Sequence, residues 1–165
     1  MIFTNAIDAA SYCSHLRENG KSIVTVSGGF DPFHIGHLRY LQAAAKLADS
    51  LIVIANGDGF LSRKKGKAFI PLNERMEILG ALRCVDVVVA WDDGTQTVVG
   101  ALEALKPDIF ANGGDRSDSR DVPEVPICEA IGCKLAFGVG GEEKLQSSSA
   151  LLAGLETAIT ITKKA

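Results

Sequence analysis

The chain of 165 residues has the length of one ordinary domain, and its content of 47% apolar and 22% charged residues excludes wholesale disorder. Its 17 Lys and Arg against 20 Asp and Glu give a formal net charge of −3, which argues against a protein whose main task is to coat nucleic acid. No apolar run approaches the ~20 residues needed to cross a bilayer, so no membrane partner is expected.

Helical and strand patterns alternate along the chain. The N-terminal residues lack a basic start and meet polar residues early, so a helix over residues 6–18 is expected rather than a secretory signal. Further helices are expected over residues 37–48, 71–82, 95–105, 124–131 and 147–160. Short buried strands are expected over residues 22–26, 51–55, 85–90, 108–111 and 134–137, and residues 56–70 are expected to form a polar loop.

Strands that are apolar on both faces and alternate with helices are typical of a parallel sheet covered on both sides. The prediction is therefore an α/β fold with a single doubly wound, five-stranded parallel sheet. We expect one domain over residues 1–165, with residues 1–20 as an N-terminal helical extension. Ligands of such sheets bind beyond the carboxyl ends of the strands, so the loops there should face one cleft.

The loop after the first expected strand reads SGGFDPFHIGH, from Ser27 to His37. Gly28 and Gly29 would let backbone amides approach a ligand, and the helix after Gly36 would supply free N–H groups. His34 and His37 are three residues apart, so both rings can project to one side and donate hydrogen bonds to phosphoryl oxygens. The pattern predicts an anion site.

Other interpretations of this loop are weaker. No Cys or third His is placed to complete a zinc site with the two histidines. The two dinucleotide and P-loop patterns, G-x-G-x-x-G and G-x-x-x-x-G-K-[ST], are absent. An ordinary turn would rarely place two histidines around a glycine at a strand-to-helix junction.

The segment GGFDPFHIGH resembles the G-x-F-D-x-x-H-x-G-H signature of the HxGH nucleotidyltransferase superfamily. The resemblance covers residues 22–152 and implies a Rossmann-like nucleotidyltransferase fold. It implies that His34 and His37 are catalytic, and that Phe30, Asp31 and Gly36 belong to the nucleotide site with Gly28 and Gly29. It also implies that Mg²⁺ accompanies a nucleoside triphosphate, held by phosphate oxygens and water, with no metal ligand assigned among the protein side chains.

Two basic features follow. The run Arg63-Lys64-Lys65-Gly66-Lys67 is by itself typical of a solvated loop, but the resemblance implies contact with the nucleotide phosphates. The loop length leaves open which lysine is equivalent; Lys65 is taken as catalytic, with Lys64 and Lys67 as nucleotide-binding. The segment PLNERMEILGALRCVD resembles the next family element and implies that Arg75 contacts phosphate or acceptor, the alternative being a surface salt bridge.

Two later segments complete the candidate site. The sequence Asn112-Gly113-Gly114-Asp115 resembles the K-G-G-D strand end of heptose-phosphate adenylyltransferases, with Asn112 in place of lysine; a plain glycine turn is the alternative. Arg116 is a weaker candidate for binding the acceptor phosphate. Three serines before the last helix resemble a family element that touches the triphosphate, and one of them is explained by N-capping alone. These serines are Ser147, Ser148 and Ser149.

The hypothesis is nucleotidyl transfer from a triphosphate, ATP being favoured over CTP, to a sugar or polyol phosphate, with loss of pyrophosphate. A heptose-1-phosphate adenylyltransferase-like enzyme is the first interpretation, and a cytidylyltransferase acting on glycerol 3-phosphate is the second. A catalytically silent nucleotide sensor is the non-enzyme alternative. Resemblance alone implies a homodimer.

The cysteines Cys13, Cys84, Cys128 and Cys133 form no C-x-x-C pair and are interpreted as reduced thiols of a cytoplasmic protein. A redox role for Cys128 and Cys133 is the less favoured alternative.

Overall fold

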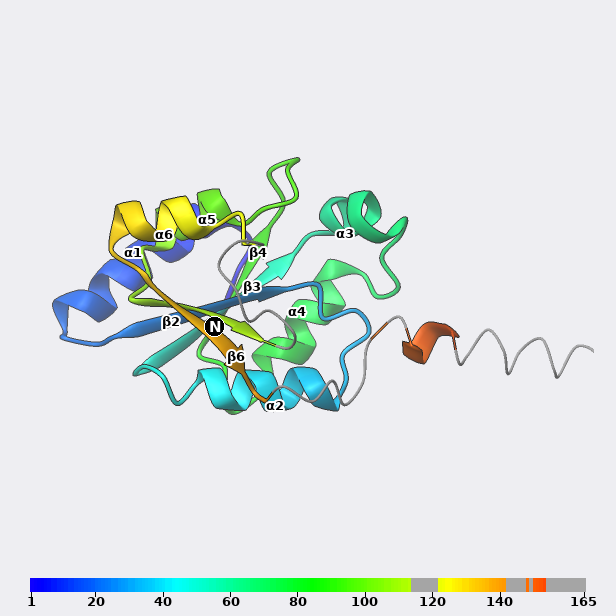
Figure 1. The fold of residues 1–165 in the computed structure, drawn as a ribbon, viewed down its shortest axis with the longest axis horizontal. Helices are drawn as coiled ribbons and strands as arrows, with labels where there is room; N and C mark the ends of the chain where they lie inside the picture. Colours follow the sequence, from blue (N-terminus) through cyan, green and yellow to red (C-terminus); the bar gives the residue numbers. More distant parts are fainter. Residues whose placement is uncertain (114–121, 142–147, 149, 154–165) are drawn as a thin grey trace, which may run out of the picture.

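The computed structural model describes residues 1–113, 122–141, 148 and 150–153. The strands are β1 (Ile2–Phe3), β2 (Ile23–Gly28), β3 (Ser50–Asn56), β4 (Val87–Trp91), β5 (Ile109–Gly113) and β6 (Lys134–Val139). The helices with labels in Figure 1 are α1 (Ala6–Glu18), α2 (Ile35–Ala44), α3 (Asp58–Lys65), α4 (Leu72–Gly80), α5 (Val99–Leu105) and α6 (Val125–Ile131).

The strands form one parallel sheet in the order β1-β4-β3-β2-β5-β6, which confirms the predicted α/β class. Every residue of β3 is buried, as its apolar, β-branched sequence predicts for an inner strand. The described residues form six strands, one more than the five expected. Strand β1 pairs Ile2 with Val88 and Phe3 with Val89, and two residues are too few to give a strand pattern in the sequence.

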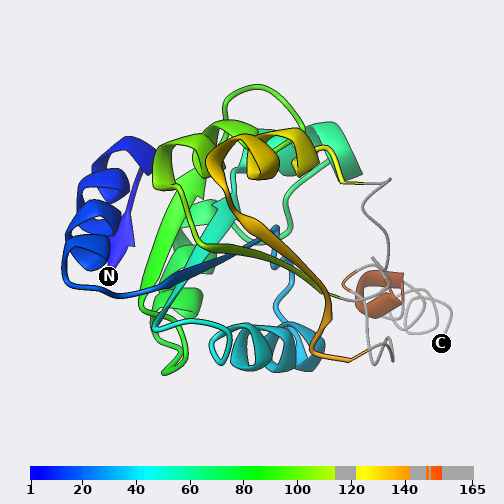
Figure 2. The ribbon, with the colours of Figure 1, turned by 60° about the vertical axis from the view of Figure 1, so that its left-hand side comes forward.

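Two helical layers cover the sheet. Figures 1 and 2 show α1, α5 and α6 on one face and α2 with α4 on the other. Side chains alternate between these layers along each strand: Ile52 and Ile54 of β3 join the core under α1, α5 and α6, whereas Val53 and Ala55 join the core over α2 and α4. The carboxyl ends of the central strands therefore meet loops from both layers at one edge.

Helix α1 belongs to the packed layer. Ala6, Ala9 and Cys13 are buried in the core, and the Arg17 guanidinium donates to the carbonyl oxygens of Leu105 and Lys106 at 2.9 and 3.1 Å. These contacts satisfy carbonyls at the end of α5 that its own turns leave unpaired. The residues expected to be an N-terminal extension thus help to hold α5 on the sheet.

Burial keeps the thiols protonated. It raises the pKa of Cys13 to about 11 and that of Cys133 to about 12, and it also raises the pKa of Cys128. Thiolates are the reactive species, so these cysteines behave as core residues, which argues against the redox alternative. None of the helices in the described part of the chain has the length and apolar content to span a membrane.

Candidate active site

The histidine loop, residues 29–34 between β2 and α2, is held in place by side-chain and backbone contacts. Asp31, only 3% exposed, accepts hydrogen bonds from the backbone N–H groups of Phe69 and Ile70 at 2.7 and 2.8 Å. Phe30 is buried with its ring edge-on to His37, the centroids 5.1 Å apart. Both side chains were expected to belong to the nucleotide site, but these contacts make them supports of the loop.

His34 is the N-cap of α2. Its Nδ1 accepts the backbone N–H groups of Gly36 and His37 at 3.1 and 3.4 Å, so the proton of the neutral ring lies on Nε2. The helix after Gly36 was expected to supply free N–H groups at its first turn, but the imidazole of His34 occupies those of Gly36 and His37. Partial burial, and secondarily the nearby Lys65, lowers the pKa of His34. His34 is therefore a neutral ring with a single N–H donor.

His37 stacks on His34, with ring centroids 3.7 Å apart and planes 19° apart. Phe33 flanks it at 5.6 Å. Burial lowers the pKa of His37 to about 3, with smaller contributions from His34 and Lys65. Its Nδ1 is buried and has no hydrogen-bond partner among the described residues. The stack therefore presents two neutral imidazoles at the start of α2.

This burial predicts an acid-sensitive stability. The pKa of His37 falls from 6.5 to about 3 on folding, so the unfolded chain binds the extra proton below pH 6.5. The stability from a neutral His37 is present above pH 6.5 and is lost towards pH 3, by up to about 1.4 kcal/mol per pH unit. Urea unfolding at about pH 7.5 and at about pH 5 tests this. Between these two pH values we expect the free energy of unfolding to fall less in His37→Gln than in the wild type, and an equal fall would contradict the burial.

Helix α3 occupies part of the segment that the sequence suggested was a loop. Its last turn carries Arg63, Lys64 and Lys65. Burial is the main cause of the lowered pKa values of His34 and His37, and the positive charge of Lys65 lowers both of them further. Lys64 instead lies over the ring of Phe60, 5.9 Å from its centroid, and Lys67 is exposed beyond Gly66. Of these three lysines, Lys65 is the one that the structure relates to the histidines.

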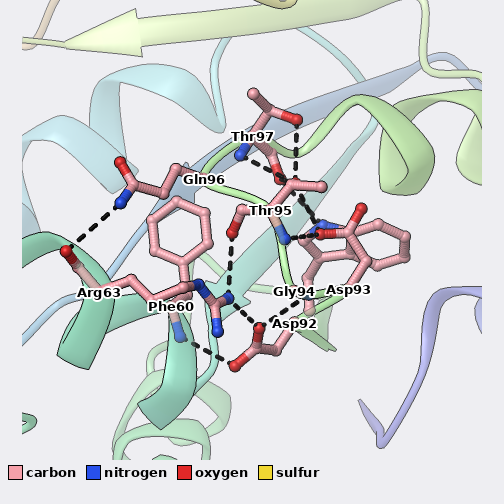
Figure 3. Close-up of polar contacts among 9 residues, drawn as sticks. Phe60, Arg63, Asp92, Asp93, Gly94, Thr95, Gln96 and Thr97 are labelled. Atoms are coloured by element: carbon pink, nitrogen blue, oxygen red, sulfur yellow. Dashed lines mark hydrogen bonds and ion pairs between the residues drawn. The ribbon is translucent and has the colours of Figure 1, made fainter.

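Asp92 caps α3 from another loop (Figure 3). The N-cap residue Gly57 has no side chain to do so, and Asp92 Oδ2 accepts the backbone N–H of Phe60 at 2.8 Å. Asp92 also forms an ion pair with Arg63, which donates to Thr95 O at 3.0 Å. A Cβ at Gly59 would lie 2.5 Å from Asp92 Oδ2, so this approach requires glycine. The sequence gives no sign of a cap supplied from so far along the chain.

We expect Asp92→Ala to loosen α3. Loss of the cap costs about 1 kcal/mol, so native-state tryptic cleavage after Lys64 and Lys65 should accelerate about fivefold. Asp93→Ala is the matched control, because the Asp93 carboxylate accepts only from Thr95 in its own turn among the contacts that the structure describes. Equal cleavage rates in the Asp92→Ala and wild-type proteins would contradict the cap.

The buried side chain of Arg75 bonds to several of the segments around the site. It is 1% exposed, and its Nε donates to Ile70 O at 2.9 Å. Its Nη1 donates to Gly29 O and Asn56 O at 2.7 and 2.8 Å, and its Nη2 pairs with Asp58 at 2.6 Å. Both sequence interpretations assumed an accessible guanidinium. The structure corrects this, since protein oxygens occupy Arg75 and leave it no surface for an acceptor.

The end of β5 packs closely on α2. The Tyr40 hydroxyl donates to Ala111 O at 2.6 Å, and a Cβ at Gly113 would lie 2.7 Å from the Tyr40 ring. Ser148 Oγ donates to Pro32 O at 3.0 Å, which brings Ser148 to the histidine loop. The other predicted residues of these segments lie outside the described residues: Gly114, Asp115, Arg116, Ser147 and Ser149.

A parallel α/β sheet with stacked histidines at a strand-to-helix junction, and a basic helix beside them, defines the nucleotidyltransferase class. Residues 25–125 match the cytidylyltransferase-like family, and the chain belongs to it. This match confirms the predicted superfamily and enzyme class.

Curated relatives support the assignment. The chain is 41% identical over 128 residues to the bifunctional protein HldE of Hahella chejuensis, covering 76% of this chain and 24% of that protein. It is 42% identical over 131 residues to the HldE of Syntrophotalea carbinolica, covering 78% of this chain and 24% of that protein. The chain thus spans about a quarter of the length of these relatives.

Solved structures share the fold. The lipopolysaccharide core biosynthesis protein from Thermoplasma volcanium is 26% identical with a TM-score of 0.59, the match covering 75% of this chain and 100% of that chain. Pantoate-beta-alanine ligase from Francisella tularensis shares the fold at 17% identity and a TM-score of 0.57, over 83% of this chain and 66% of that chain.

Proposed function

We propose that this domain transfers a nucleoside monophosphate from ATP to a sugar phosphate of the heptose-1-phosphate type. The acceptor's phosphate oxygen attacks the α-phosphorus, the bond from that phosphorus to the bridging oxygen breaks, and pyrophosphate leaves with the bonding pair. Such a reaction needs positioning and charge stabilisation rather than a protein nucleophile. Mg²⁺ arrives with the triphosphate as part of the substrate, bound mainly by phosphate oxygens and water.

The stacked pair of neutral imidazoles beside Lys65 is the observation that carries this proposal. His34 has its Nδ1 tied to the helix cap, so its Nε2–H is the group left to donate to a phosphoryl oxygen. Neutral donors stabilise the growing charge without binding the ground-state triphosphate as tightly as cations would. Lys65 supplies the positive charge for the departing pyrophosphate, and Lys64 and Lys67 stay assigned to the nucleotide phosphates.

The choice of ATP and a sugar phosphate rests on similarity. The resemblance of the NGGD segment to heptose-phosphate adenylyltransferases agrees with 38–42% identity to several HldE proteins. Gly113, Gly114 and Asp115 are proposed to bind the nucleoside, and the serines from Ser147 to Ser149 the triphosphate. Arg116 is proposed to meet the acceptor phosphate. A cytoplasmic homodimer is also proposed, to be tested by sedimentation of the purified protein.

The direct test is a pyrophosphate-release screen that crosses ATP, CTP, GTP and UTP with sugar, polyol and amino-alcohol phosphates. We expect release with ATP and a heptose or hexose 1-phosphate. Release only with CTP and glycerol 3-phosphate would replace this proposal with the cytidylyltransferase. Tight ATP binding without release from any pair would favour a silent sensor.

A further inference from the structure

Three buried polar side chains near the carboxyl ends of the strands have an atom without a hydrogen-bond partner among the described residues. These atoms are Asn56 Oδ1, Asn112 Nδ2 and Glu124 Oε2, in residues that are 6%, 5% and 6% exposed. A buried polar group left unpaired costs about 1–3 kcal/mol, so native proteins rarely keep several together. The polar groups of a ligand, or bound water, would complete the bonding of these atoms.

The two asparagines face the same side of the sheet. Ile54 and Phe110 join the core under α1, α5 and α6, and the next residues, Ala55 and Ala111, join the opposite core. Side chains alternate along a strand, so Asn56 and Asn112 point to the α5 and α6 side. Strands β3 and β5 flank β2, which separates the asparagines by two strand spacings, about 10 Å across the sheet. The register places Asn56 level with Gly29, just beyond β2, and Asn112 level with Ser27, so they are also offset by about 7 Å along the strands.

Strand pairing and two hydrogen bonds relate Glu124 to Asn56. Asn56 pairs in register with Trp91 on the neighbouring strand, so the two side chains share a face. The Trp91 indole N–H donates to Thr97 O at 3.1 Å. The next residue, Val98, donates its backbone N–H to Glu124 Oε1 at 3.1 Å, which leaves Oε2 unused. Glu124, at the start of α6, therefore meets the start of α5 in the loop that follows β4, the strand that pairs with Asn56.

The donor and acceptor pattern selects the ligand. Asn56 and Glu124 offer oxygens that need donors, and Asn112 offers an N–H group that needs an acceptor. A phosphate has only acceptor oxygens, and its charge would be repelled by the Glu124 carboxylate. A hydroxyl both donates and accepts, so a polyol satisfies all three residues.

We propose that Asn56, Asn112 and Glu124 bind the hydroxyls of the acceptor sugar and set acceptor specificity. This inference rests on the proposed function. The acceptor's phosphate then meets His34 and His37, while its carbon chain extends under α5 and α6. Asn112 was expected to serve the nucleotide, but its side chain lies on the opposite face from Gly113 and the Tyr40 ring.

The test uses Glu124→Gln, Asn56→Leu and Asn112→Leu in steady-state pyrophosphate release with ATP and glucose 1-phosphate or glycerol 3-phosphate. We expect the KM for glucose 1-phosphate to rise about tenfold in each variant, because one hydrogen bond to a buried group is lost. The KM for ATP should stay unchanged, and the preference for the sugar phosphate over glycerol 3-phosphate should fall.

Thr25→Val is the matched control. It removes a buried hydroxyl from β2, the strand between the two asparagines, and this hydroxyl already has a partner because it donates to Ile109 O. A rise in the KM for ATP alone would assign the three residues to the nucleotide and overturn the inference, as would unchanged acceptor kinetics.

Direct binding separates this inference from the proposed function. If the wild type releases no pyrophosphate, the proposed function fails. Calorimetric titration of glucose 1-phosphate then tests on its own whether the three residues bind the sugar. Weaker binding to the three variants than to the wild type supports the inference, and equal or absent binding overturns it.

Discussion

His34→Asn is expected to lower kcat by about 100- to 1,000-fold while leaving the Kd for ATP within a few-fold of the wild type. Asparagine keeps an oxygen that can cap α2, as His34 Nδ1 does for the backbone N–H groups of Gly36 and His37. It lacks the Nε2–H, which is the donor assigned to the transition state. The substitution therefore separates the role of His34 as the cap of α2 from its role as a hydrogen-bond donor to the transition state.

The comparison with His34→Ala makes the test sharper. Alanine removes both the cap and the donor, so the free energy of unfolding should fall by about 1 kcal/mol relative to His34→Asn. Turnover should be equally poor in both variants, because both lack the donor. Stopped-flow or coupled pyrophosphate assays at saturating ATP measure kcat, and calorimetry measures Kd. A His34→Asn variant with near-normal kcat would show that the ring only caps the helix.

His37→Ala should lower kcat to a similar extent. Its neutral ring stacks on His34 at 3.7 Å and lies between Phe30 and Phe33. The pKa values of both rings are lowered, so we expect kcat to show no histidine-dependent fall as the pH rises from 6.5 to 8. A catalytic imidazolium would instead lose activity across that range.

The sequence predicted the features that local patterns encode. Alternating apolar strands and helices indicated the parallel sheet, and the spacing of His34 and His37 indicated that both rings lie on one side of the turn. It did not predict β1, because two residues give no periodicity, nor α3, because the cap of that helix is Asp92 on a distant loop. Helix α5 begins later than expected because Asp93 and Thr95 form a turn at its predicted start.

Arg75 was the clearest difference between sequence and structure. An arginine within a helix that also carries Glu74 and Glu77 is usually exposed, and nothing in that pattern indicates that three chain segments would surround it. Only the tertiary fold brings Gly29 O, Asn56 O and the Asp58 carboxylate to one guanidinium. Burial of a cation is tolerated because nearly all of its N–H groups are bonded.

Arg75→Met is accordingly expected to lower the free energy of unfolding by about 3 kcal/mol or more, since it leaves several inward-facing oxygens without a donor. Arg83→Met, which removes an exposed arginine just beyond the same helix, should change it by less than about 0.5 kcal/mol. Urea unfolding of both variants makes the measurement. Because Arg75 holds the carbonyl of Gly29 in the histidine loop, the folded fraction of Arg75→Met should also lose turnover. A loss of less than about 1 kcal/mol would show that water replaces the guanidinium and that Arg75 does not organise the site.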